Sequence, residues 1–177
     1  TSGHSFFILI YSLLYIRGHL FISSRYLPVC QNSDEVLTLM TTALTTNQWD
    51  QGVTTSVPGA VAALDETLMS YLAIGRETGG LLKSVLTSDP DMVMGHCLKG
   101  YFFCLMASGP LLARLPKVLD AANKGLSGAT MREQAHVQAL THWAGGDQRT
   151  AARVWEEILS EHPQDVLALR LAHHAYF

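Results

Sequence analysis

Residues 132–177 read REQAHVQALTHWAGGDQRTAARVWEEILSEHPQDVLALRLAHHAYF, and this stretch decides the fold. It has the composition of a helix, a tight Gly-Gly-Asp turn, a second helix, a proline stop and the beginning of a third helix. Two helices joined by so short a turn lie side by side, and each leaves an apolar face to be covered. The stretch therefore predicts a helical hairpin repeat, a unit that is stable only when neighbours stack on it.

The second helix of this hairpin carries the clearest periodicity. Its apolar residues recur at spacings of three and four, which places them on one helix face: Ala151, Val154, Trp155, Ile158 and Leu159. Asp147 stands where an N-cap side chain is expected, and Pro163 ends the helix. Before the first helix, Thr130 and Glu133 have the spacing of a capping box.

Counted from Arg132, this hairpin resembles the tetratricopeptide repeat, a helical pair of about 34 residues. The best repeat covers residues 132–165. The resemblance assigns a structural role to six small, turn, aromatic and stop residues of the chain: Gly100, Ala139, Gly146, Ala151, Trp155 and Pro163. The match is incomplete, since Ala135 stands in place of the usual tryptophan and His142 in place of the usual tyrosine.

An earlier stretch repeats the same organisation. SVLTSDPDMVMGHCLKGYFF at residues 84–103 parallels EILSEHPQDVLALRLAHHAYF at residues 157–177. Each contains the end of an apolar helix, a proline with an acid close behind it, and an apolar helix that ends in aromatic residues. Internal similarity of this kind favours an array of helical repeats over a single bundle. We therefore expect an all-α fold, an α-solenoid of tetratricopeptide-like hairpins that is truncated at its C-terminus.

The motifs DPDMVMGH, MREQAHVQAL, VWEEILSEHPQDVLAL and AHHAYF resemble the N-terminal part of the tetratricopeptide repeat protein 38 family. The resemblance covers residues 49–177 and implies a helical repeat domain there, within a longer parent protein. It also implies a non-catalytic scaffold that binds another protein or a peptide, and it brings no substrate. Residues 1–48 show no such resemblance, and we expect them to form an atypical N-terminal segment.

In tetratricopeptide arrays the first helix of each pair lines a concave groove. The resemblance carries those positions onto six candidates for a peptide-binding groove: His136, Leu140, Trp143, Arg170, His174 and Tyr101. Such a groove would accept an extended or helical peptide. His136 and Leu140 do not supply the basic and amide groups with which some relatives hold acidic C-terminal tails. The alternative is that Leu140 and Trp143 simply pack against the next repeat.

The sequence contains no motif that carries catalysis. It lacks a P-loop, a nucleophile elbow, a zincin motif and an EF-hand loop. His136 and His142 are six residues apart and His173 and His174 are adjacent, so neither pair can chelate a metal from one helix face. We expect no cofactor, and we expect His96 to be a hydrogen-bonded core residue. The alternative function is an enzyme or metal-binding protein whose histidine site is completed by downstream repeats.

Composition bounds the class of protein. Hydrophobic residues make up 48% of the 177 residues and charged residues 15%, which excludes a disordered chain. The formal net charge of −3 provides no basic surface for nucleic acid. Three cysteines without a CxxC pair are typical of a reducing compartment, so we expect a cytoplasmic protein.

Outside the repeats, the sequence predicts helices over residues 60–75, 81–88, 92–107 and 119–126, a weak helix over 34–44, and no convincing strand. The apolar run at residues 6–16 is shorter than the roughly 20 residues that span a bilayer. We interpret it as an artefact or variant start, with a signal or anchor segment, or a helix laid on the repeats, as alternatives.

The last helix is expected to lack its partner. Its apolar residues would then be partly uncovered and would favour self-association: Leu167, Leu169, Leu171 and Phe177.

Overall fold

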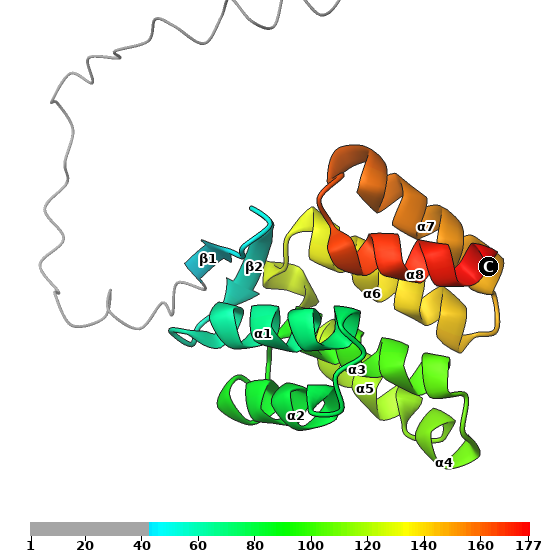
Figure 1. Ribbon diagram of the computed structural model, residues 1–177, viewed down its shortest axis with the longest axis horizontal. Helices are drawn as coiled ribbons and strands as arrows, with labels where there is room; N and C mark the ends of the chain where they lie inside the picture. The colour runs from blue at the N-terminus through cyan, green and yellow to red at the C-terminus, as the bar shows by residue number, and fades with distance from the viewer. Residues whose placement is uncertain (1–42) are drawn as a thin grey trace, which may run out of the picture. The chain divides into compact units, whose positions relative to one another are not determined.

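The computed structural model describes residues 43–177, and their fold is mostly helical (Figure 1). A short β-hairpin comes first, with β1 at Ala43–Thr46 and β2 at Gly52–Thr55. The helices follow in the order α1 (Ala60–Leu72), α2 (Thr78–Ser88), α3 (Val93–Met106), α4 (Gly109–Leu112), α5 (Leu115–Lys124), the 3-10 turn η2 (Leu126–Gly128), α6 (Met131–Ala144), α7 (Gln148–Glu161) and α8 (Val166–Tyr176). The expected helical class is confirmed.

The β-hairpin is a correction to the sequence prediction, which contained no strand here. The two strands pair antiparallel, with Ala43 opposite Thr55. Threonines, whose branched side chains favour extended backbone, make up two of the four residues in each strand. The side-chain oxygen of Asn47 closes the turn by accepting hydrogen bonds from the N–H groups of Trp49 (3.0 Å) and Gln51 (2.9 Å). The domain boundary expected between residues 48 and 49 falls inside this turn.

Some predictions lie outside the described residues. They are the apolar run at residues 6–16 and the weak helix over 34–44 up to residue 42. The last two residues of that expected helix belong to β1. Among the helices of residues 43–177, none combines the length and hydrophobicity that a bilayer crossing requires.

Two helices begin earlier than predicted. Helix α2 starts at Thr78 and takes up the glycine pair at 79–80, because a glycine lowers helix stability by only about 1 kcal/mol, which the burial of Leu82 can offset. Helix α5 starts at Leu115, because Pro116 lies in its first turn, where a missing N–H leaves no hydrogen bond unmade.

The two helices of the hairpin predicted at residues 132–165 begin at the predicted capping residues. The capping box between Thr130 and Glu133 is present at α6, and Asp147 caps α7 by accepting a hydrogen bond from the N–H of Thr150. Gly146 adopts a left-handed φ of 85° in the turn between these helices. Helix α6 therefore turns back into α7, and α7 packs in turn against α8 (Figure 1).

Several fully buried side chains lie where α3, α6 and α7 meet. Tyr101, Leu140 and Trp155 are fully buried there, as are the small residues Ala139 and Ala151. Tight contact between α3 and α6 follows from a glycine. A Cβ atom on Gly100 would lie 2.4 Å from Cδ2 of Leu140, closer than side chains tolerate.

We expect the substitution Gly100→Ala to destabilise the protein by about 1–3 kcal/mol, because the added methyl group forces the fully buried Leu140 side chain to shift within the core. Urea unfolding followed by circular dichroism measures this loss. The matched control is Gly79→Ala in α2, where a Cβ meets nothing within 4 Å. In the double variant Gly100→Ala/Leu140→Ala, the loss of stability should be smaller than the sum of the losses in the two single variants. Strict additivity would show that the helices do not touch at this point.

The apolar residues of α8 divide between two faces. Leu167 and Leu171 are buried, so the expectation that they are uncovered is wrong; they lie on the face that meets the core. Leu169 and Phe177 are exposed, at 56% and 99%. Self-association through these two residues stays a prediction.

Candidate functional site

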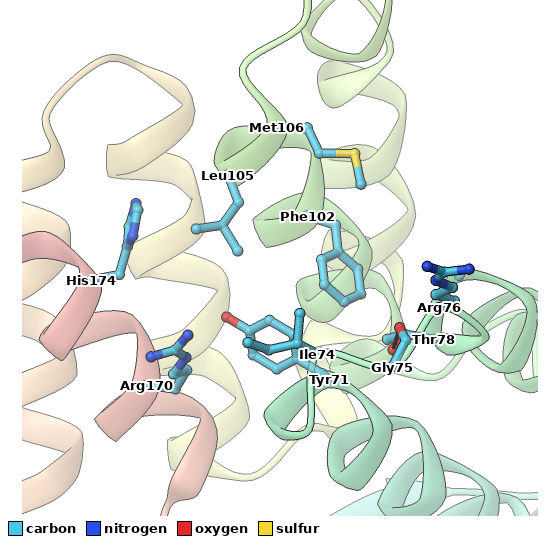
Figure 2. Close-up of a pocket in the computed structure, with 11 residues that line it drawn as sticks. Tyr71, Ile74, Gly75, Arg76, Thr78, Phe102, Leu105, Met106, Arg170 and His174 are labelled. Atoms are coloured by element: carbon cyan, nitrogen blue, oxygen red, sulfur yellow. Dashed lines mark hydrogen bonds between the residues drawn. The ribbon is translucent and has the colours of Figure 1, made fainter.

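The candidate site is a pocket of about 490 Å³ formed by the end of α1, the loop that follows it, the end of α3 and one face of α8 (Figure 2). Two aromatic rings are central to its apolar lining. Tyr71 and Phe102 meet edge to face, with 5.1 Å between ring centroids. Met106, exposed at 67%, adds a flexible apolar side chain at the edge. An exposed apolar hollow of this kind is the usual form of a ligand site.

Ile74 gives the pocket an unusual rim. Helix α1 ends in a Schellman arrangement, in which the N–H of Gly75 bonds to the carbonyl of Ser70 at 2.7 Å and the N–H of Ile74 bonds to that of Tyr71 at 3.1 Å. The left-handed residue of this motif is usually glycine, yet here it is Ile74, with φ 59° and 81% of its surface exposed. A β-branched residue in this conformation is strained by about 1–2 kcal/mol. Strain that exposes an apolar side chain beside a pocket points to a use for that side chain.

We therefore expect Ile74→Gly to stabilise the protein by about 1 kcal/mol, because glycine adopts the left-handed conformation without strain. Thermal and urea unfolding measure the change. Ala107→Gly is the matched control, since Ala107 ends α3 with φ 46° but does not line the pocket. A loss of stability in Ile74→Gly would show that the side chain contributes packing that outweighs its backbone strain.

Two arginines, Arg76 and Arg170, line the pocket together with the imidazole of His174, and no aspartate or glutamate of the described chain is among its lining residues. Burial raises the pKa of the Tyr71 phenol above its ordinary value, and the nearby positive charge of Arg170 opposes that rise. The His174 ring lies 6.0 Å from the ring of Trp143, centroid to centroid, so Trp143 packs beside this lining residue.

Of the six groove candidates, the structure brings Arg170 and His174 into this pocket and places Trp143 beside His174. His136, Leu140 and Tyr101 are 0% exposed. The prediction that these three line an open groove is therefore wrong. The faces of α3 and α6 that the repeat pattern assigns to a groove are covered by neighbouring helices.

Sequence reasoning missed several pocket residues: Tyr71, Ile74, Arg76, Phe102, Leu105 and Met106. Of those on α3, Phe102 directly follows the predicted groove residue Tyr101, and Leu105 and Met106 lie about one helical turn beyond it. Because α3 is apolar on almost every side, its sequence does not indicate which side stays open. A helix-end signal at Ile74 was also lacking, since no glycine or asparagine stands there.

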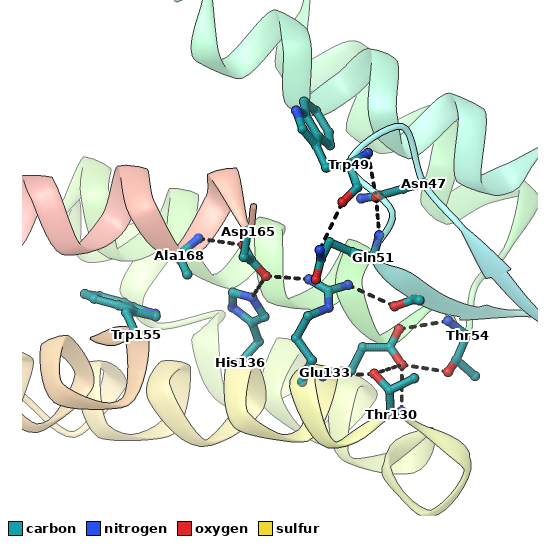
Figure 3. Close-up of polar contacts among 12 residues, drawn as sticks. Asn47, Trp49, Gln51, Thr54, Thr130, Glu133, His136, Trp155, Asp165 and Ala168 are labelled. Atoms are coloured by element: carbon teal, nitrogen blue, oxygen red, sulfur yellow. Dashed lines mark hydrogen bonds and ion pairs between the residues drawn. The ribbon is translucent and has the colours of Figure 1, made fainter. Parts of the chain in front are cut away.

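A second group of polar residues, centred on Asp165, is buried (Figure 3). Asp165 caps α8 through a 2.8 Å hydrogen bond from the N–H of Ala168. Its carboxylate also accepts from Arg132 Nη1 at 2.6 Å and from His136 Nε2 at 3.0 Å. Burial alone would raise the pKa of Asp165, but the charge and hydrogen bond of His136 and the charge of Arg132 hold it well below its ordinary value. Asp165 is therefore ionised, and it joins α6 to α8.

The same network holds the β-hairpin in place. The Glu133 carboxylate accepts hydrogen bonds from the N–H and hydroxyl of Thr54, at 2.9 and 2.6 Å, and from both groups of Thr130. Arg132 Nη2 donates to the carbonyl of Gly52 at 3.0 Å. The charged members of this network and His136 are almost fully enclosed, and Arg132 is the most exposed of them at 6%. Because a ligand cannot reach it, we interpret the network as a structural link that holds the β-hairpin, α6 and α8 together.

The histidines of the described part of the chain do not gather around one point. Within residues 43–177, no group of three or more His, Cys, Asp or Glu side chains is arranged to hold a metal ion. His96 Nε2 lies 2.7 Å from the carbonyl oxygen of Pro90, which confirms the predicted core histidine. His136 belongs to the Asp165 network and His174 to the pocket.

Cys97 and Cys104 are free thiols on α3. Burial raises the pKa of the Cys104 thiol to about 11, and raises that of fully buried Cys97 as well. We expect neither thiol to react with iodoacetamide at pH 8 in the native protein, and both to react in urea. Mass spectrometry of the tryptic peptides reads out each thiol separately. Rapid native labelling of Cys104 would show that burial does not raise its pKa.

Comparison of the chain with protein-family models finds no match, and no solved structure matches it.

Proposed function

We propose that this chain is a non-catalytic interaction module of the tetratricopeptide type, which binds a peptide of a partner protein in the pocket between α1, α3 and α8. The observation that carries the proposal is the exposed apolar pocket, with strained Ile74 held on its rim. The paired helices and the glycine-mediated contact between α3 and α6 support the repeat assignment. A cytoplasmic location is part of the proposal, in keeping with the free thiols of α3.

Selection from a display library of random dodecapeptides tests this function, because it presupposes no partner. Selected peptides should bind the purified chain. Their affinity for the Ile74→Gly variant should be about tenfold lower than for the wild type, because the substitution removes apolar surface worth about 1.4 kcal/mol. Ala107→Gly should bind them as the wild type does. Failure to enrich any peptide, or equal binding by both variants and the wild type, would contradict the proposed function.

A further inference from the structure

The basic character of the pocket is local. The chain as a whole carries a formal net charge of −3, so arginines do not gather there merely because the surface is basic. Among residues 43–177, the two ion pairs that form belong to Asp165, and neither Arg76 nor Arg170 has a carboxylate within pairing distance. Arg76 and Arg170 are both exposed residues, so each can meet an anionic ligand.

The two arginines stand on opposite sides of the apolar lining. Figure 2 shows Arg170 and His174, both from α8, on one side of the pocket, and Arg76, from the loop after α1, on the other. Tyr71 and Phe102 lie between them. The order across the pocket is therefore cation, apolar surface, cation.

From this order we infer that the ligand is an internal peptide segment in which acidic side chains flank one large apolar side chain on both sides. This inference rests on the proposed function and adds the chemistry of the partner. The apolar side chain would pack on Tyr71 and Phe102 beside Ile74, while one carboxylate pairs with Arg170 and the other with Arg76. Arginine suits this role because its planar group meets a carboxylate with two parallel hydrogen bonds.

A free C-terminal carboxylate is a weaker match. It supplies one negative charge at the end of a chain, and it would leave one of the two arginines without an anion. A segment with an acid at each side satisfies both, and the charges also fix its position along the pocket.

Three fluorescein-labelled peptide pools test the inference by fluorescence anisotropy. All are acetylated and amidated, with the cores Glu-x-Phe-x-Glu, Gln-x-Phe-x-Gln and Glu-x-Ala-x-Glu, where x is one or two residues of glycine or serine. The first pool should bind at least tenfold more tightly than each of the others. Its advantage over the glutamine pool should shrink as NaCl is raised, because salt screens exposed charge pairs.

Charge reversal provides the sharpest comparison. The variant Arg76→Glu/Arg170→Glu should lose binding to the acidic pool and gain binding to a Lys-x-Phe-x-Lys pool. Arg149→Glu is the matched control, since Arg149 is an exposed arginine on α7 outside the pocket, and it should bind the acidic pool as the wild type does.

The outcomes separate the two proposals. Equal binding of the acidic and glutamine pools, no binding of any pool, or indifference to the arginine reversal would overturn the acidic-ligand inference. So would tighter binding of a glutamine-core peptide with a free C-terminus. The peptide-binding function would still stand in each case if library-selected peptides lose affinity to Ile74→Gly.

Discussion

Replacing Asp165 with alanine is expected to destabilise the protein by about 3–5 kcal/mol, one of the two largest losses that we predict for a single substitution. The carboxylate is 2% exposed and contacts two buried side chains, the Arg132 guanidinium and the His136 ring. Its removal leaves the Arg132 guanidinium buried without its counter-charge, and it also removes the N-cap of α8. Urea unfolding monitored by far-UV circular dichroism measures the loss.

Two variants separate the charge from the cap. Asp165→Asn keeps a side-chain oxygen for the N–H of Ala168 but removes the charge. It should therefore show most of the destabilisation expected for Asp165→Ala. Asp147→Ala removes an exposed N-cap that has no ion pair, and its loss should be much smaller. If Asp165→Asn is as stable as the wild type, the buried ion pair contributes nothing and our interpretation of the network is wrong.

The network also predicts how stability depends on pH. The folded pKa of Asp165 lies below its ordinary value of 3.8, so its stabilising contribution is fully present above that range. The contribution is lost as pH falls below about 4, toward the folded pKa, because the carboxyl group must then be protonated. Asp165→Asn should lack this component, so its free energy of unfolding should fall less steeply than that of the wild type as the pH is lowered below about 4.

Replacing Trp155 with alanine is expected to cost a similar amount, about 3–5 kcal/mol, because it leaves a large cavity where α3, α6 and α7 meet. The indole is fully buried. Its ring packs edge to face on Trp143 at 5.3 Å and on Tyr101 at 5.8 Å between centroids, and its Nε1 donates to the Tyr101 hydroxyl at 3.2 Å.

Trp155→Phe is the conservative comparison. It keeps an aromatic ring in the core and gives up the hydrogen bond to Tyr101, which in turn donates to the carbonyl of His136 at 2.8 Å. We expect a smaller loss than for alanine, measured by the same urea unfolding. Equal losses for both variants would mean that the hydrogen bond, and not the packed ring, holds the three helices together.

Local features were predictable from the sequence. The capping box at Thr130, the cap at Asp147 and the helix stop before Pro163 depend on neighbours a few residues away, and all three are present. The β-hairpin was not predictable in this way. Its strands are four residues long, and Glu133 and Arg132, some 79 and 80 residues away, fasten them to α6.

The pocket depends on how helices stack, which a repeat pattern fixes only for regular repeats. The pattern placed Tyr101 and His136 on an open face, but the packing of α7 and α8 encloses both. It found Arg170 and His174 because they lie on the open face of the last helix. Arg132 and Asp165 could have been suspected, since each is a charged residue beside an apolar helix face, but their pairing spans 33 residues.

Methyl NMR of the chain during titration with a library-selected peptide tests the central claim most directly, namely that the helical repeats present a peptide site between α1, α3 and α8. The probes are the Ile74 and Met106 methyl groups in the pocket. Buried Ile158 of α7 and exposed Met131 of α6 serve as internal controls. We predict that the Ile74 and Met106 signals shift in proportion to bound peptide while those of Ile158 and Met131 stay in place. Shifts at Met131 with unchanged Ile74 and Met106 would contradict the account.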